Sequence, residues 1–199
     1  MAGGSRQRVR AARGSQRARR GLVLVVSLLT AAAASSSPAA AAHSGCRHAR
    51  GGPAQLSPTA ARRALLCLVN AERRRHGAPR VRAAGRLRVA ATRHAADMAA
   101  NDYFAHDAPS GATVTDRVRA TGYLADARSW ALGETIAWGR AQAATPLGVV
   151  RMFLASPPHR AILLDPAFRD LGVGIARGAP AGPEAGALTV TLDFGRRDG

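Results

Sequence analysis

Two histidines and one glutamate are the side chains of this sequence best suited to form a polar functional site. His106 and His159 each lie in a polar, proline-flanked context at the end of a predicted helical segment, where a ring nitrogen can face a cleft. Glu134 lies between them in a stretch predicted to be non-helical. Imidazole and carboxylate groups are ligands for divalent metal ions. The separations of 28 and 25 residues are too long for a local metal motif, so only the fold can bring the three together or show their grouping to be accidental.

His94 is a histidine of a different kind, because it lies on the apolar stripe of a predicted helix. A buried polar side chain in such a position is normally satisfied by a hydrogen bond. We therefore interpret His94 as a core histidine with one hydrogen-bond partner rather than as a ligand.

The commonest local catalytic signatures are absent from the sequence. All 29 basic residues are arginine, and the lack of lysine excludes a P-loop, a Schiff-base lysine and a Ser–Lys dyad. The sequence also contains no G-x-S-x-G, H-E-x-x-H or C-x-x-C motif. We assign no catalytic residue from the sequence.

The candidate histidines lie within or at the ends of predicted helices, so the helices determine their positions. Ser57-Pro58 predicts a helix start, with proline at the first helical position, and Gly77 marks its end. A second helix is predicted over 87–101, where many alanines imply a close approach to its neighbour. Shorter helices are predicted after caps at three places, namely Thr115-Asp116, Thr145-Pro146 and Ser156-Pro157-Pro158.

Strands are predicted late in the chain. The best candidates are 171–175 and 187–194, joined by a loop at 178–186. Helices followed by a terminal hairpin indicate an α+β fold with a small antiparallel sheet covered by helices. We expect one domain over 57–199, preceded by a Gly/Pro/Arg-rich linker at 43–56.

The N-terminus is typical of a secretory signal peptide. Seven arginines lie within residues 6–20, an apolar run follows at 22–34, and a small-residue zone ends at Ala42. The 13-residue apolar run is shorter than the roughly 20 residues that span a bilayer. We expect cleavage after residue 42, a secreted protein and no stable membrane anchor. The sequence does not distinguish the general from the twin-arginine export route.

The net charge is concentrated in one segment. It is +17 for the whole chain and +10 without residues 1–42. Residues 62–93 contain ten arginines and one acid, whereas 94–199 contain ten arginines and eleven acids. A basic patch of this kind could attract an anionic lipid, an anionic cell-envelope polymer or nucleic acid, and a solvated arginine-rich helix face is the alternative.

Cys46 and Cys67 are the only cysteines. In an exported protein such a pair predicts a disulfide, which would stabilise the fold by about 3 kcal/mol in the chain-entropy model. It would attach the start of the mature chain to the first helix.

Five motifs in order resemble the CAP superfamily, which comprises cysteine-rich secretory proteins, antigen 5 and pathogenesis-related proteins. They are LCLVNAER (66–73), HAADMA (94–99), NDYFAH (101–106), GETIA (133–137) and SPPHR (156–160). The similarity is strongest to the bacterial SCP-like extracellular branch and covers about 65–195. It implies an α-β-α sandwich, and the placement of the two cysteines resembles bacterial members with an N-terminal bridge.

The resemblance also implies a cleft with two histidines and two glutamates, which holds a divalent metal in some members. His106, Glu134 and His159 match three of these positions, and Ser156 stands where the second glutamate would be. Phe153 replaces the usual tryptophan, and Thr135 replaces the usual asparagine. Two imidazoles and one carboxylate could hold zinc or another divalent metal with one open position. A hydrogen-bonded His–Glu–His cluster that only ties loops together is an equal alternative.

Three functions follow from these observations. The favoured one is a secreted, non-catalytic binding module with a cleft formed by His106, Glu134, His159 and Ser156, in a family linked to sterol or lipid binding. The arginine-rich helices would then bind an anionic partner. The second is a metal-assisted hydrolase of peptide or ester bonds, with Glu134 as general base. Nucleic-acid binding is disfavoured, because the sequence has few aromatic residues and no helix-turn-helix pattern.

Overall fold

The structure is a computed structural model that describes residues 45–182 and 184–199. The predicted signal peptide, residues 1–42, and the first two residues of the predicted linker lie outside this described part of the chain. Within residues 45–182 and 184–199, no helix combines the length and the apolar character needed to cross a membrane.

Most of the described helices begin where the sequence offers a cap or a helix-compatible proline. Ser57 caps the first described helix through its hydroxyl, and Thr145 caps a later one in the same way. The helices are α2 (Pro58–Arg75), α3 (Gly85–Ala100), α4 (Val114–Arg119), η1 (Ala141–Ala144, a 3-10 helix), α5 (Pro146–Ala155) and α6 (Pro157–Leu164).

A four-stranded sheet runs through the middle of the domain. Its strands are β1 (Arg82–Ala83), β2 (Ser129–Gly139), β3 (Asp170–Arg177) and β4 (Leu188–Asp198). The spatial order is β1-β3-β4-β2, so β2 forms one edge. The pairs β3–β4 and β2–β4 are antiparallel, whereas β1 pairs with β3 in parallel.

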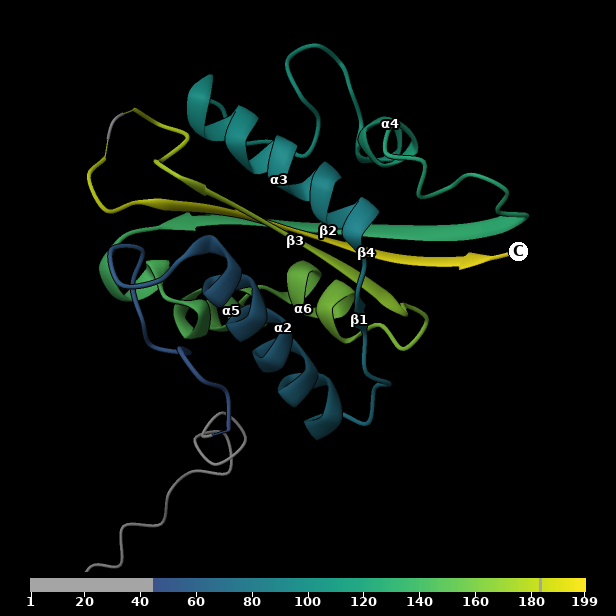
Figure 1. The fold of residues 1–199 in the computed structure, drawn as a ribbon, viewed down its shortest axis with the longest axis horizontal. Coiled ribbons are helices and arrows are strands. Elements are labelled where there is room, and N and C mark those ends of the chain that lie inside the picture. Colours follow the sequence, from purple (N-terminus) through teal and green to yellow (C-terminus); the bar gives the residue numbers. More distant parts are fainter. Residues whose placement is uncertain (1–44, 183) are drawn as a thin grey trace, which may run out of the picture. The chain divides into compact units, whose positions relative to one another are not determined.

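Helices cover both faces of this sheet. Figure 1 shows α3 and α4 on one face and α2, α5 and α6 on the other. The main apolar core lies between the sheet and the second group, where Leu65, Phe153, Leu192 and Phe194 are fully buried. The predicted α+β fold and α-β-α layering are therefore confirmed.

Helix α3 packs directly on the backbone of β3. A Cβ added to Gly172 would lie 2.2 Å from the backbone of Leu87, and one added to Gly174 would lie 2.1 Å from the backbone of Ala91. Only glycine in the strand allows this approach, because any Cβ at these two positions would overlap the helix backbone. The alanine content of the helix correctly predicted close packing.

Three details of the predicted fold need correction. The α4 cap is Thr113, whose side chain exchanges hydrogen bonds with Asp116, two residues earlier than the predicted cap begins. The sheet is mixed rather than wholly antiparallel, because the two-residue strand β1 is parallel to β3. Strand β2 was not predicted as a strand, because Gly133, Glu134 and Thr135 interrupt any apolar alternation in it.

The predicted disulfide is confirmed. Cys46 and Cys67 are bonded, with their Cα atoms 5.7 Å apart, so the segment before α2 is attached to that helix. The backbone N–H of Leu147 in α5 also donates to the carbonyl of Ala49, at 2.8 Å. Residues 45–56 are thus held against both helices.

Candidate functional site

Glu134 is the centre of the polar cluster. It lies on β2, and its side chain is only 3% exposed. Because side chains alternate across a strand, Glu134 faces the α3 side of the sheet, whereas Thr135 and Ala137 face the main core. The non-helical position predicted for Glu134 is correct.

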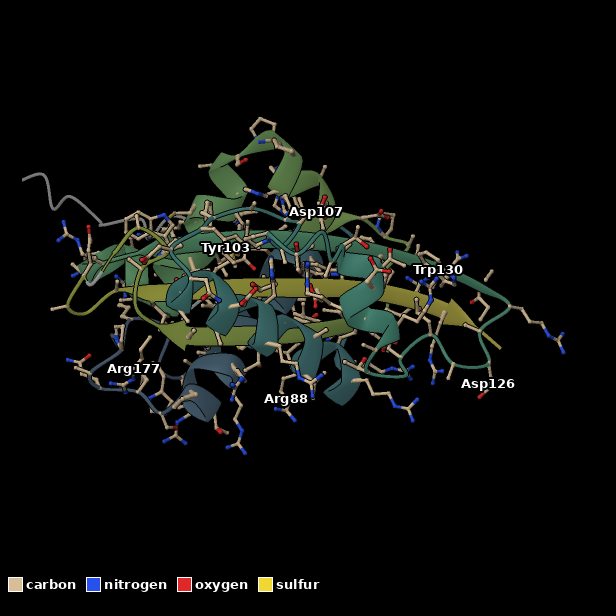
Figure 2. All side chains as sticks on the ribbon, turned by 90° about the horizontal axis from the view of Figure 1, so that it is seen from above. Arg88, Tyr103, Asp107, Asp126, Trp130 and Arg177 are labelled. Atoms are coloured by element: carbon tan, nitrogen blue, oxygen red, sulfur yellow. A yellow bond between two sulfur atoms is a disulfide. The ribbon has the colours of Figure 1, made fainter. Side chains whose placement is uncertain are left out.

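Two hydrogen-bond donors hold the Glu134 carboxylate, one at each oxygen. His106, on the loop after α3, donates through Nδ1 to Oε1 at 2.8 Å. Arg117, on α4, donates through Nη2 to Oε2 at 2.7 Å. Tyr103 and Asp107, labelled in Figure 2, lie on either side of His106 along this loop. The cluster therefore joins an edge strand, a loop and a short helix.

His94 supports the cluster from α3. It is buried, and its Nε2 donates to the carbonyl of Ala105 at 3.0 Å and lies 3.8 Å from Oε1 of Glu134. This confirms the prediction of a core histidine, but His94 has two partners rather than one, because its Nδ1 also lies 3.4 Å from the Tyr103 hydroxyl. Tyr103, whose hydroxyl donates to Asp97, packs with its ring near that of His94. These contacts hold the backbone next to His106 in place.

Asp193 adds a second buried carboxyl group, which the sequence analysis missed. It lies on β4 directly opposite Glu134 and is 1% exposed. No donor within the described residues reaches either of its oxygens. Thr189 and Thr191 alternate with apolar residues and share one face of β4 with Asp193. From sequence alone, such a polar face is expected to be exposed to solvent, whereas here a helix covers it.

Burial and charge set the pKa values of the two carboxyl groups in opposite directions. Burial raises the pKa of Asp193 well above its usual value, and the Glu134 charge raises it further. Burial also opposes ionisation of Glu134, but the hydrogen bond from His106 and the charge of Arg117 outweigh it, so the pKa of Glu134 is lowered. Glu134 is thus the ionised member and Asp193 the protonated member, which can share its proton with Glu134.

The two candidate histidines also differ. The hydrogen bond to Glu134 raises the pKa of His106, against the effect of its partial burial. Burial lowers the pKa of His159, and the charge of His106 lowers it further. His159 packs against the edge of Phe153, with ring centroids 5.4 Å apart. No hydrogen bond in the described chain joins His159 to Glu134.

Ser156 is the residue before α6 and is half-buried. Its hydroxyl makes no capping hydrogen bond, and its backbone carbonyl accepts from the N–H of Arg160. The structure therefore brings His106 and Glu134 together. Within the described residues, no hydrogen bond or ion pair joins either of them to His159 or Ser156.

The three predicted metal ligands do not form a three-ligand site. Within residues 45–182 and 184–199, no group of three or more His, Cys, Asp or Glu side chains could hold a metal ion. Both Glu134 oxygens are already engaged by His106 and Arg117. The ring nitrogen of His106 opposite Glu134 remains available, because that side chain is 53% exposed.

Comparisons with known proteins agree with this architecture. Residues 66–191 match the CAP family, described as the cysteine-rich secretory protein family. A comparison with curated proteins finds no match.

Two solved bacterial structures are similar to this chain. An extracellular protein containing an SCP domain from Bacillus anthracis is 27% identical, with a TM-score of 0.55 over 70% of this chain and 43% of that one. An outer surface protein from Borrelia burgdorferi is 17% identical, with a TM-score of 0.59 over 72% of this chain and 97% of that one. This chain thus spans less than half of the length of the Bacillus anthracis protein.

Replacing Arg117 tests whether the cluster stabilises the fold. Arg117→Met leaves the buried Glu134 charge with one cation fewer, and we expect the free energy of unfolding to fall by about 3 kcal/mol. The matched control is Arg119→Met on the same helix, where the arginine is 62% exposed and we expect a change within about 0.5 kcal/mol. Urea unfolding measures both, and equal effects of the two substitutions would contradict a supporting role for Arg117.

The buried Asp193 predicts a specific pH dependence of stability. Because its pKa is raised in the folded protein, the unfolded chain releases this proton at lower pH than the folded one. Stability therefore falls as pH rises from about 4 towards the folded-state pKa. Asp193→Asn removes this titration, so its stability relative to wild type should rise by at least about 1 kcal/mol between about pH 4 and about pH 7.

Asp126→Asn, at an exposed position, controls for the loss of one charge. Urea unfolding across this pH range is the measurement for all three proteins. A constant difference between Asp193→Asn and wild type at every pH would refute the assignment of a protonated Asp193.

Proposed function

This chain belongs to the cysteine-rich secretory protein (CAP) family, and from that premise we propose that it is a secreted, non-catalytic binding module. Secretion is supported by the signal-like N-terminus and the Cys46–Cys67 disulfide. It is also supported by the similarity to proteins described as extracellular and outer surface.

The engagement of both Glu134 oxygens carries the non-catalytic part of the proposal. A general base needs an accessible oxygen and a pKa near the working pH. Glu134 has neither, because its side chain is only 3% exposed beneath His106 and Arg117 and its pKa is lowered. Asp193 is buried behind it and holds its proton. These contacts favour a binding module over the alternative, a metal-assisted hydrolase of peptide or ester bonds.

The groups left for a ligand are the imidazoles of His106 and His159. Glu134 fixes the His106 ring through Nδ1, an arrangement in which a carboxylate orients a histidine that binds through its other nitrogen. The lowered pKa of His159 keeps that ring neutral and able to accept a metal or a donor group. Zinc or another divalent ion would have two protein ligands here, with the remaining positions open to water or a small ligand.

Zinc titration by calorimetry tests this site. We expect wild type to bind one zinc ion weakly and the double variant His106→Ala/His159→Ala to lose at least about tenfold in affinity. His76→Ala, at an exposed histidine on another part of the domain, is the matched control and should bind as wild type does. Equal heats for wild type and the double variant would end the metal proposal.

A panel of peptide and ester substrates, with zinc and with chelator, is the companion assay. We expect no turnover in either condition. Hydrolysis that requires zinc and disappears in His106→Ala would overturn the non-catalytic assignment and favour the hydrolase.

The arginine-rich segment supplies a surface for an anionic partner. Not all of its arginines are available, because Arg73 is fully buried and donates to four backbone carbonyls, and Arg82 is paired with Asp170. Arg63, Arg74 and Arg80 are different. All three are exposed, and within the described residues none has an ion pair or a side-chain hydrogen bond.

These three arginines line one hollow of about 360 Å³ beside the disulfide, and no acidic residue among those that the structure describes lines it. The Asn70 side chain accepts from the N–H of Val81 and donates to its carbonyl, both at 2.9 Å. This pair of bonds fixes the chain after α2 against that helix and brings Arg80 next to the other two. We refer to this surface as the basic hollow. A phosphate-bearing lipid or cell-envelope polymer fits its charge.

Salt-dependent binding tests the basic hollow. The probes are phosphatidylglycerol vesicles, with phosphatidylcholine vesicles as the neutral reference, and soluble polyphosphate, which separates a lipid surface from a phosphate polymer. At about 1 kcal/mol per arginine, replacing all three by glutamine should weaken binding by roughly a hundredfold. The control triple Arg93→Gln/Arg128→Gln/Arg160→Gln changes the net charge equally. Binding that is insensitive to salt, or equally weakened in the two triples, would contradict the proposal.

A further inference from the structure

A polar pocket lies where the segment before α2 meets the start of α5. It has a volume of about 250 Å³, and no acidic residue of the described chain lines it. Its polar side chains come from three places, namely Arg50 before α2, Gln142 in η1, and Thr145 and Arg151 at the start of α5. We refer to it as the Arg50–Arg151 pocket.

Two arginines give this pocket its charge. Arg50 and Arg151 are both exposed, and within the described residues neither makes an ion pair or a side-chain hydrogen bond. By contrast, Arg140, the residue before η1, is paired with Glu184 at 2.9 Å. Two unpaired guanidiniums that line one pocket repel each other, and a bound anion with two charges relieves that repulsion.

The backbone joins the two segments that carry these arginines. The carbonyl of Ala49, next to Arg50, accepts from the N–H of Leu147 at 2.8 Å. Leu147 and Arg151 are one helical turn apart on α5 and therefore lie on the same side of the helix. The disulfide holds the same segment on α2. A preformed pocket binds without the entropy cost of ordering its own wall.

The first turn of α5 does not itself supply donors for an anion. Its first residue is a proline, and the N–H of Leu147 is bonded to Ala49. The N–H of Gly148 donates to the Thr145 hydroxyl, which donates in turn to the carbonyl of Gln142. The arginine side chains must therefore provide the hydrogen bonds to an anion, and the positive end of the helix only adds to their charge.

Gln142 supplies a neutral polar group in the same pocket. The η1 backbone lies so close to α5 that a Cβ added to Gly148 would overlap the carbonyl oxygen of Gln142. Glycine at this position allows the approach and so places Gln142 beside the two arginines. Its side-chain amide is exposed and, within the described part of the chain, makes no hydrogen bond. An amide can both donate to and accept from a hydroxyl group.

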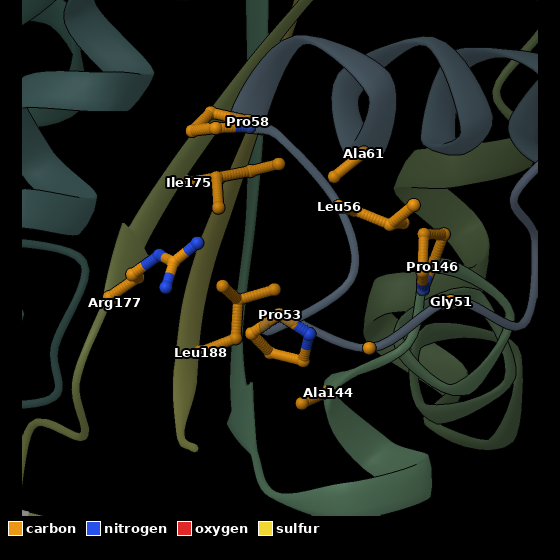
Figure 3. Close-up of a pocket in the computed structure, with 11 residues that line it drawn as sticks. Gly51, Pro53, Leu56, Pro58, Ala61, Ala144, Pro146, Ile175, Arg177 and Leu188 are labelled. Carbon is orange, nitrogen blue, oxygen red and sulfur yellow. The ribbon is translucent and has the colours of Figure 1, made fainter. Parts of the chain in front are cut away.

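A separate, apolar cavity lies at the same junction of η1 and α5. Ala144 and Pro146 line it together with Leu56 and Leu188 (Figure 3). Its one charged lining residue among those described is Arg177, and neither Arg50 nor Arg151 lines it. The Arg50–Arg151 pocket is therefore a different site, and Arg177 can act as a control arginine outside it.

We propose that the Arg50–Arg151 pocket binds a small phosphate monoester, with the phosphate on the two guanidiniums and a hydroxyl group of the organic part on Gln142. A phosphate monoester carries roughly two negative charges at neutral pH, and arginine binds its oxygens through paired hydrogen bonds. None of the residues of the His–Glu cluster or the arginines of the basic hollow lines this pocket, so the proposal does not depend on either.

The experiment uses glycerol 3-phosphate as the probe, with inorganic phosphate and glycerol each representing one part of it. By calorimetry at low ionic strength, we expect wild type to bind glycerol 3-phosphate with a Kd of about 1 mM or tighter, inorganic phosphate more weakly and glycerol not at all. The double variant Arg50→Gln/Arg151→Gln should weaken the binding of glycerol 3-phosphate at least about tenfold.

The control double variant Arg93→Gln/Arg177→Gln changes the net charge equally at two exposed positions outside the pocket. It should bind glycerol 3-phosphate as wild type does. The variant with all three basic-hollow arginines replaced by glutamine should also bind it as wild type does, so failure of this proposal is distinguishable from failure of the proposed function.

A further variant tests the contact to the organic part. Gln142→Ala should weaken the binding of glycerol 3-phosphate about threefold and leave the binding of inorganic phosphate unchanged. Equal affinity of wild type for inorganic phosphate and glycerol 3-phosphate would overturn the assignment of an ester. Equal weakening by the two double variants, or no binding of glycerol 3-phosphate at about ten times the expected Kd, would overturn the site itself.

Discussion

A buried carboxylate must keep its charge in this domain, and the neighbouring elements are arranged around that requirement. Removing Glu134 from water is costly unless a cation or hydrogen-bond donors compensate it. His106 and Arg117 do so from a loop and from α4, one at each oxygen. This contact therefore ties α4 and the loop after α3 to the edge strand, and the packing of Val118 against Leu87, Ala90 and Tyr123 also holds α4. His94 and Ala105 fix the backbone that presents His106.

A carboxylate in a cluster of histidines can act as a metal ligand or base, or it can orient its neighbours through hydrogen bonds. The contacts of Glu134 favour the second role. As a metal ligand or a base, Glu134 would need an oxygen within reach of a metal ion or a substrate, and its side chain is only 3% exposed. It orients His106 and Arg117 instead, and the exposed face of His106 is the part that meets solvent. The second carboxyl group, Asp193, lies behind the first and stays protonated through burial and repulsion. Glu134 and Asp193 are residue types that could bind a metal or act as a base, but their burial and their contacts in this structure disfavour both roles.

The surfaces proposed for binding lie in two different parts of the domain, and the disulfide holds in place the segment that forms part of one of them. The His–Glu cluster lies at the edge strand β2. The basic hollow and the Arg50–Arg151 pocket lie along residues 45–56, α2 and α5, where the Cys46–Cys67 bond and the packing on α5 hold the segment that the sequence presents as a linker. The arginines of the arginine-rich segment also lie in two environments. Arg73 is fully buried, whereas Arg63, Arg74 and Arg80 are exposed.

The sequence by itself determined the features that local chemistry controls. Ser57 and Thr145 with their following prolines fixed two helix starts, and the motifs around His106, Glu134 and His159 identified the family. Alanines in α3 and the two cysteines correctly predicted close packing and a bond. Strand β2, the buried Asp193, the Arg117–Glu134 pair and the Arg50–Arg151 pocket were decided only by the tertiary structure. Each of these features depends on residues far apart in the chain. The sequence around a polar residue does not determine whether that residue will be exposed to water or covered by a helix.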